Sequence, residues 1–121
     1  MALRVIAFYE DHWMPPGTDK AQWDHLCRAY GVELQMIRDW SEANIQPEDH
    51  VVLIDEAGTE ELPHLMMGTV VFVFGRSAQD LTTNIPDWEW DASYCIKTPS
   101  AVPMFGISAA SIVLDRYLGG R

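Results

Sequence analysis

The sequence predicts an α/β protein with a mostly parallel sheet of five or six strands and helices on both faces. The first observation behind this is the alternation of short apolar β-type runs with helical segments along the chain. The second is the size and composition: 121 residues, 48 % of them hydrophobic, suffice for one domain over residues 1–121 with a buried core. We see no internal repeat, low-complexity tract or linker.

Five apolar runs predict the strands. Each is rich in β-branched or aromatic residues and is bounded by polar, Pro-containing or Gly-containing segments. The most apolar run of the chain ends in Phe74-Gly75. The predicted strands cover residues 3–9, 32–37, 51–54, 69–74 and 93–97.

The first predicted helix follows a Pro/Gly loop at residues 12–18. Asp19 can cap this helix, because Gln22 stands three residues on, in the capping-box position. Gly31 fits the position after the last helical residue. One helical face collects the apolar side chains of Trp23, Leu26, Cys27 and Tyr30.

The other connections are shorter. Residues 40–50 form a polar loop with room for one helical turn, and residues 85–92 form a loop with two tryptophans. A short helix is expected where Pro63 can occupy the first turn. Helical segments are thus predicted at residues 59–67, 77–81 and 107–118.

The charge distribution limits the classes of partner. The formal net charge is −10, and residues 39–75 contain eight acids and no Lys or Arg. Phosphate contacts supply most nucleic-acid affinity, so this charge argues against a broad nucleic-acid surface. A solvated acidic face is the simple interpretation, and an RNA site would have to be a small local patch.

The cysteines, histidines and apolar segments exclude other classes. Cys27 and Cys95 lie in structural segments, which favours reduced thiols over a disulfide. The four histidines and two cysteines show no metal-ligand spacing, so no metal is expected. No apolar run approaches the roughly 20 residues of a membrane span. The first residues lack the features of a signal peptide, so we expect a cytoplasmic protein.

Three groups of residues, in order along the chain, resemble a known family. The amino-terminal group has a strand ending in Tyr-Glu, a Pro-Pro loop, and a helix with Leu-Cys followed by Gly. The middle group is LIDEAGT, and the last contains Phe-Gly, a Pro and a Ser-rich helix start. The order and spacing resemble the SPOUT class of RNA methyltransferases, especially those that methylate a ribose 2′-oxygen of the tRNA wobble nucleotide. The matching residues are Tyr9, Glu10, Pro15, Pro16, Leu26, Cys27, Gly31, Ile54, Gly58, Thr59, Phe74, Gly75, Pro99 and the run at 108–114.

The resemblance implies a C-terminal trefoil knot, S-adenosylmethionine held by three loops, and a homodimer built on the first and last helices. The last helix is relevant to this dimer, because it has an apolar stripe and two further apolar residues, Ile112 and Val113, that lie off the stripe. A helix that is apolar on more than one face needs a second partner surface, from a dimer or from the same domain. The stripe itself consists of Ile107, Ala110, Ser111, Leu114 and Leu118.

The same resemblance implies where a cofactor would bind. Adenosine sites combine apolar walls with backbone hydrogen bonds, and a glycine lets the ligand approach the backbone closely. Phe105 could form part of such a wall or could instead fill the pocket and close it. The implied cofactor-binding residues are Ile54, Gly75, Thr98, Met104 and Phe105.

Several polar positions of the family differ in this chain. His25 stands where the family has a catalytic Arg, and it could act as a general base or be a surface helix histidine. Ser77 and Asp80 replace a Glu and a Gly of the second motif, and the Asn of the third falls on Phe105 or Gly106. The additional charge of Arg76 could reach a carboxylate or phosphate, or lie in solvent.

Two functions follow as hypotheses. The retained loops favour an S-adenosylmethionine-dependent RNA methyltransferase, with ribose 2′-O methylation of tRNA as the expected reaction. The acidic charge and the substituted motif residues favour a catalytically inactive SPOUT-fold protein that binds the cofactor or a protein partner. Trp88 and Trp90 share one loop, but the acids around them disfavour nucleic acid, so we expect packing or a protein interface there.

Overall fold

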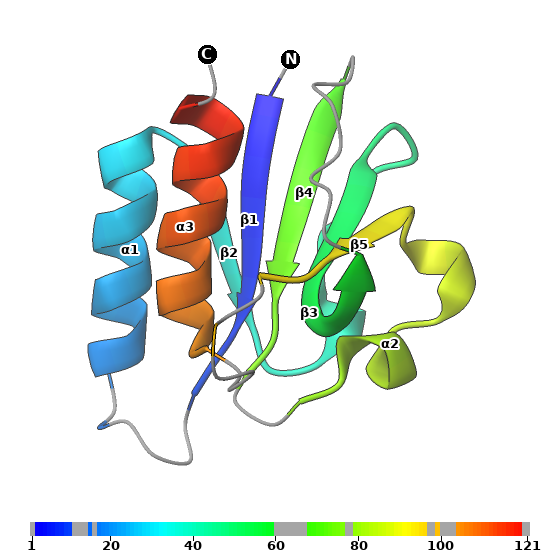
Figure 1. Cartoon of the computed structure of the whole chain (residues 1–121), viewed down its shortest axis with the longest axis horizontal. Coiled ribbons are helices and arrows are strands. Elements are labelled where there is room, and N and C mark those ends of the chain that lie inside the picture. Colours follow the sequence, from blue (N-terminus) through cyan, green and yellow to red (C-terminus); the bar gives the residue numbers. More distant parts are fainter. Residues whose placement is uncertain are drawn as a thin grey trace.

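The computed structural model describes residues 2–10, 15, 17–59, 68–76, 79–96, 99 and 104–119. They form a five-stranded, all-parallel sheet with helices, which confirms the predicted α/β class (Figure 1). The strands are β1 (Ala2–Phe8), β2 (Glu33–Ile37), β3 (His50–Thr59), β4 (Thr69–Phe74) and β5 (Ala92–Tyr94). The helices are α1 (Thr18–Tyr30), α2 (Leu81–Asn84) and α3 (Gly106–Gly119), with 3₁₀ turns η1 (Trp40–Glu42) and η2 (Asp87–Glu89).

The sheet is buried on both faces. Its strand order is β2-β1-β4-β3-β5, so β4 lies between β1 and β3. Along β1, Val5 and Ala7 belong to one hydrophobic cluster, while Ile6 and Phe8 belong to the other. Strands covered on both faces are apolar at successive positions, which explains why the runs of the inner strands β1, β3 and β4 are nearly continuous rather than alternating.

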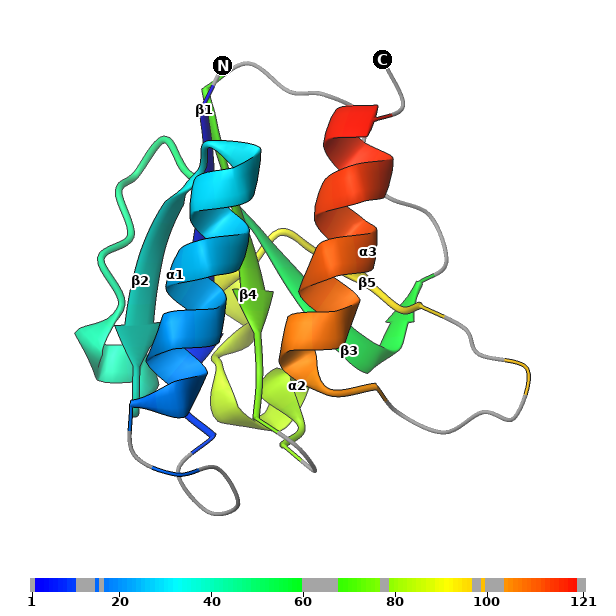
Figure 2. The ribbon, with the colours of Figure 1, turned by 90° about the vertical axis from the view of Figure 1, so that its left-hand side faces the viewer.

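Helices α1 and α3 lie side by side over one face of the sheet (Figure 2). The Trp23 ring of α1 packs on Phe74 at the end of β4, with 5.4 Å between ring centroids. The Tyr117 ring of α3 meets Phe72 edge-on, at 5.0 Å. These aromatic contacts anchor both helices to the central strand β4.

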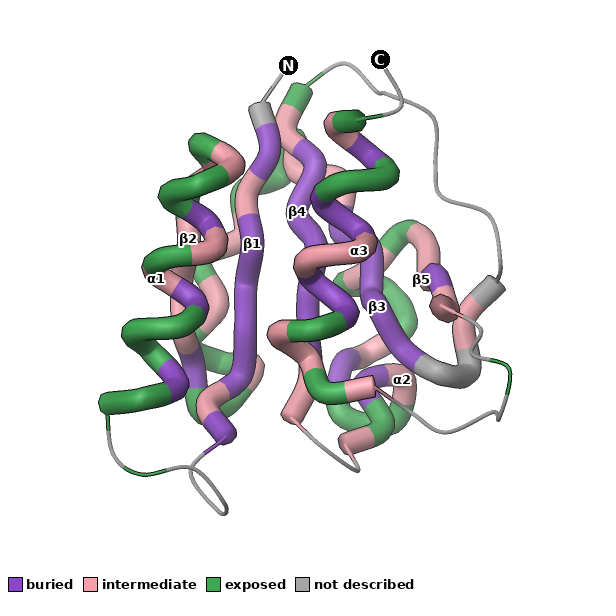
Figure 3. The backbone as a smooth tube through the Cα atoms, turned by 60° about the vertical axis from the view of Figure 1, so that its left-hand side comes forward, coloured by how far each residue is buried: buried purple, intermediate pink, exposed green. Residues whose placement is uncertain are grey.

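Short turns and loops cover the opposite face, where the sequence predicts further helices. Leu81 and Ile85, at the two ends of the single-turn helix α2, are buried there. Half-buried side chains of the segments around η1 and η2 complete this layer: Trp40, Ala43, Ile45 and Trp90. The burial pattern follows this arrangement: the inner strands β1, β4 and β3 are mostly buried between the two covering layers, and the helices are exposed on their outer sides (Figure 3).

The start of α1 differs from the prediction, and its end agrees. Gly17 occupies the N-cap position without a side-chain hydrogen bond, so the predicted capping box of Asp19 and Gln22 is wrong. Asp19 is buried, and its carboxylate accepts the backbone N–H of Glu10 at 2.7 Å. That bond ties the start of α1 to the end of β1. Gly31 ends the helix with a left-handed φ of 69°, as expected.

Several element boundaries also differ. Strand β3 runs on to Thr59, whereas the predicted strand ended at residue 54, and Asp55 is a buried strand residue. Strand β5 ends at Tyr94, and the helical turn predicted at 77–81 lies at Leu81–Asn84. Asp80 caps that turn by accepting the Thr82 N–H at 3.0 Å. The helix predicted at 59–67 lies outside the described residues beyond Thr59.

The last helix has one buried face, turned slightly from the predicted stripe. Val113 and Tyr117 lie on the buried face, while Ser111 and Leu118 are only half-buried. The sequence placed the apolar side chain of Val113 off the stripe, and packing within the domain accounts for it. The homodimer stays a prediction. The described residues show neither a sixth strand nor a knot.

Both cysteines are free thiols within the described part of the chain, Cys27 buried and Cys95 half-buried. Burial in the α1 core raises the pKa of Cys27 to about 11, so this thiol is protonated at neutral pH. No helix among the described residues is long and apolar enough to cross a membrane.

Candidate functional site

The carboxyl ends of β1 and β4 form the first candidate site. From β1 the chain continues to β2 at one edge of the sheet, and from β4 it continues to β5 at the other edge. Ligands of open α/β sheets bind where neighbouring strands diverge in this way. The crevice there is lined by Phe8, Glu10, Asp19, Trp23, Gly75, Phe105, Gly106 and Ile107.

The predicted cofactor residues are only partly brought together at this crevice. Gly75 and Phe105 line it, and Phe105 is 52 % exposed. Ile54 instead belongs to the hydrophobic core under the helices, and the half-buried Met104 packs against that core. Thr98 lies outside the described residues.

The described part of this crevice is closed. It has essentially no space that a water molecule could occupy, whereas small-molecule pockets enclose about 300–1,000 Å³. A Cβ placed on Gly75 would lie 3.0 Å from Gln79 Oε1, and one on Gly106 would lie 3.0 Å from the Gly75 carbonyl oxygen. The two glycines thus permit close packing of the loop after β4 and of the start of α3.

Arg76 joins three strand ends. Its Nε donates to the Tyr9 carbonyl at 3.2 Å, after β1, and its terminal nitrogen donates to the Arg38 carbonyl at 2.8 Å, after β2. Arg76 itself follows β4, and its guanidinium lies 5.2 Å from the centre of the Phe8 ring. The sequence suggested an anion ligand or a solvated side chain, but this Arg holds the carboxyl edge together.

The structure gives little support to a general-base role for His25 or to a metal site. His25 lies on the exposed side of α1, as the surface interpretation predicts, and it does not line the crevice. Among the described residues, no group of three or more His, Cys, Asp or Glu side chains is placed to hold a metal ion.

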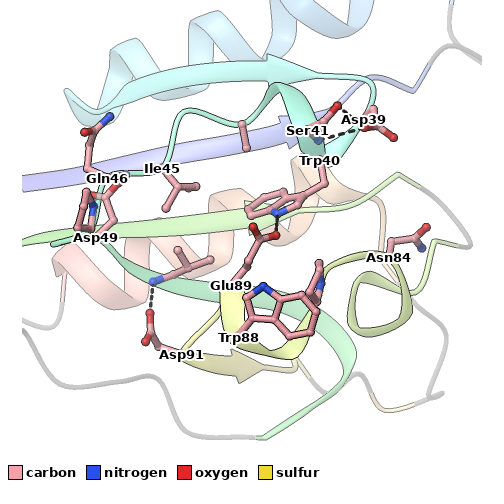
Figure 4. Close-up of a pocket in the computed structure, with 14 residues that line it drawn as sticks. Asp39, Trp40, Ser41, Ile45, Gln46, Asp49, Asn84, Trp88, Glu89 and Asp91 are labelled. Atoms are coloured by element: carbon pink, nitrogen blue, oxygen red, sulfur yellow. Dashed lines mark hydrogen bonds between the residues drawn. The ribbon is translucent and has the colours of Figure 1, made fainter.

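A second and much larger site lies on the sheet face opposite α1 and α3. This acidic groove has a volume of about 770 Å³, within the usual range of binding pockets. One wall is the segment between β2 and β3, and the other runs from α2 through η2 to β5 (Figure 4). Its lining consists of Asp39, Trp40, Ser41, Ala43, Ile45, Gln46, Pro47, Asp49, Val51, Asn84, Pro86, Trp88, Glu89 and Asp91.

Hydrogen bonds between distant segments hold the two walls of the groove in place. The Trp40 indole N–H donates to the Glu89 carboxylate at 2.6 Å, across the groove. The Val51 backbone N–H donates to Asp91 at 2.8 Å, which fixes the approach to β5. Arg4 pairs with Asp49 at 2.9 Å beneath the first wall. These bonds therefore fix the shape of the groove.

The groove carries negative charge. Its lining contains four carboxylates and, among the described residues, no Lys or Arg. The Asp49 side chain is only 2 % exposed and is neutralised by Arg4. Asp39, Glu89 and Asp91 are exposed. Hydrogen bonds from the Ser41 hydroxyl and backbone N–H lower the pKa of Asp39, which stabilises its ionised form.

The sequence indicates parts of the acidic groove but not the groove itself. It singled out the tryptophans and acids of residues 85–92 and the acids that begin at Asp39, and it predicted packing or a protein interface for the first. Trp90 does pack against the sheet, while Trp88 is 85 % exposed. The two groups are about forty residues apart, so only the sheet order brings them together.

Comparison with known proteins does not assign the chain to a family. No protein-family model matches the sequence, and no curated protein matches it.

Proposed function

We propose that this protein is an interaction module that binds a polypeptide partner in the acidic groove. One observation carries the proposal: a groove of about 770 Å³, built from two distant segments, that presents Trp88 to solvent. Tryptophan is enriched at the energetic centres of protein interfaces because its large ring gains much from being covered. The proposal corresponds to the catalytically inactive, protein-interaction alternative that the family resemblance implied.

Selection from a random displayed-peptide library tests this function. We expect the protein to enrich peptides whose binding is lost in Trp88→Ala, since that change removes the exposed ring without touching the core. Phe105→Ala is the matched control, because Phe105 is the other exposed large apolar side chain among the described residues and lies at the carboxyl edge. Enriched peptides that bind Trp88→Ala as well as the parent would contradict the proposal.

The second candidate function is the S-adenosylmethionine-dependent RNA methyltransferase. The observation that favours it is the meeting of Gly75 and Phe105 where β1 and β4 diverge. This candidate includes the knot and the homodimer on α1 and α3 that the resemblance implies. The closed crevice and the acidic charge count against it.

Calorimetric titration with S-adenosylmethionine and its demethylated product separates the two candidates. We expect no heat of binding at high micromolar ligand, because the described part of the crevice lacks space for an adenosine group. Saturable heat that Gly75→Leu abolishes, in a variant whose circular dichroism is unchanged, would support the methyltransferase instead. Methyl transfer to bulk tRNA would then be the next measurement.

A further inference from the structure

The chemistry of the acidic groove also indicates what kind of polypeptide it binds, an inference that rests on the proposed function. Trp88 is 85 % exposed, so one large aromatic surface is available beside the groove. In Figure 4 the Glu89 carboxylate lies between the indoles of Trp40 and Trp88. An aromatic face next to a carboxylate attracts a cation by two forces, the ring quadrupole and the ionic charge.

The exposed carboxylates of the groove retain hydrogen-bonding capacity. Asp39 caps η1 through bonds from Ser41 and from the Glu42 backbone. Glu89 bonds Trp40 and Asp91 bonds Val51, in each case through a single carboxylate oxygen. The second oxygen of Glu89 and of Asp91 accepts no hydrogen bond from the described residues. A ligand with several N–H donors can therefore bind without displacing the bonds that build the groove.

The charge balance selects a basic ligand. Arg4, which pairs with Asp49 of the groove lining, also donates to the Asn44 carbonyl and is therefore already bound. The charge of Arg76 acts on Asp39, whereas Glu89 and Asp91 face the groove without a compensating cation in its lining. A nucleic acid would be repelled, and a second copy of this chain, at −10, would be too.

We propose that the acidic groove binds an arginine-containing basic peptide segment, with a guanidinium stacked on Trp88 and donating to Glu89. Arginine fits this site better than lysine, because its planar guanidinium can stack on an indole and bond a carboxylate with two N–H groups at once. Acids on both walls, Asp39 on one and Asp91 on the other, favour a segment with several basic residues over a single small cation.

Fluorescence anisotropy with a labelled peptide of alternating arginine and serine tests this assignment. A peptide with citrulline in place of arginine is the control, since citrulline keeps the shape and loses the charge. We expect the arginine peptide to bind with a Kd that rises with salt, and to bind Trp88→Ala about tenfold more weakly. Glu89→Gln should also weaken binding, while Asp115→Asn, the same charge change on the exposed side of α3, should not.

Equal binding of the citrulline peptide, or equal losses in Glu89→Gln and Asp115→Asn, would overturn the assignment by showing either no charge recognition or only general attraction. The library selection separates this inference from the proposed function. Groove-dependent peptides that lack arginine would leave the interaction module standing and refute the arginine ligand. If no peptide depends on Trp88, both fall.

Discussion

Phe72→Ala should lower the free energy of unfolding by about 3–5 kcal/mol, the usual cost of truncating a fully buried aromatic side chain. Phe72 lies in β4, the middle strand of the sheet, and its side chain is 0 % exposed. Its ring makes the edge-on contact with Tyr117 that holds α3 on the sheet. The substitution therefore leaves a cavity and also weakens a helix contact.

Urea denaturation followed by tryptophan fluorescence measures this loss, with the midpoint and the m-value compared between variants. Phe105→Ala is the matched control, because Phe105 is 52 % exposed and its truncation should change stability by no more than about 0.5 kcal/mol. Phe72→Leu keeps most of the volume and should cost about 1.5 kcal/mol or less, which keeps the test possible if the Ala variant does not fold. Similar midpoints for Phe72→Ala and Phe105→Ala would show that β4 is not the centre of the core.

Gly58→Ala should cost about 1–3 kcal/mol, as other forced expansions of a packed site do. A Cβ on Gly58 would lie 2.7 Å from both the backbone N and the backbone C of Tyr94, closer than packed atoms tolerate. The register between β3 and β5 shifts between Ile54 and Thr59, so the glycine lies within this irregular pairing. The methyl group can be accommodated only if β5 moves away from β3.

The displacement should be local as well as destabilising. Tyr94 also accepts a hydrogen bond from Arg116 of α3 at 2.7 Å, so movement of β5 strains a second contact. Amide hydrogen exchange should show faster exchange in β5 and unchanged protection in β1. Gly119→Ala, whose Cβ would make ordinary contacts with Asp115 from 3.6 Å, should leave stability nearly unchanged. Unaltered β5 protection in Gly58→Ala would contradict the close strand approach.

Much of the fold could be predicted because each element has a local signature. The strand Thr69–Phe74 has the predicted bounds, and Gly31 ends α1 as its left-handed conformation requires. The errors lie where a distant partner decides the outcome. Asp19 bonds the end of β1 instead of capping its own helix, and the extension of β3 beyond Ile54 depends on its pairing with β5.

The candidate sites were less predictable, since they depend on which loops meet. The sequence singled out Gly75 and Phe105, and the fold does bring them together, but the crevice they line has no space for a ligand in its described part. Arg76 was predicted as an anion ligand or a solvated side chain, because nothing local shows that the carbonyls of Tyr9 and Arg38 lie within its reach.

The sequence by itself determined the α/β class, most of the strands, the two long helices and the strong negative charge. These follow from residue spacing and composition, which are properties of short segments. Only the tertiary structure decided that β4 inserts between β1 and β3, that Asp39 and Trp40 face Trp88 and Glu89, and that Trp88 stays exposed while Trp90 packs. The reason is physical: strand order and loop contacts arise from pairing between residues far apart in the chain, and no local pattern encodes which partner each segment meets.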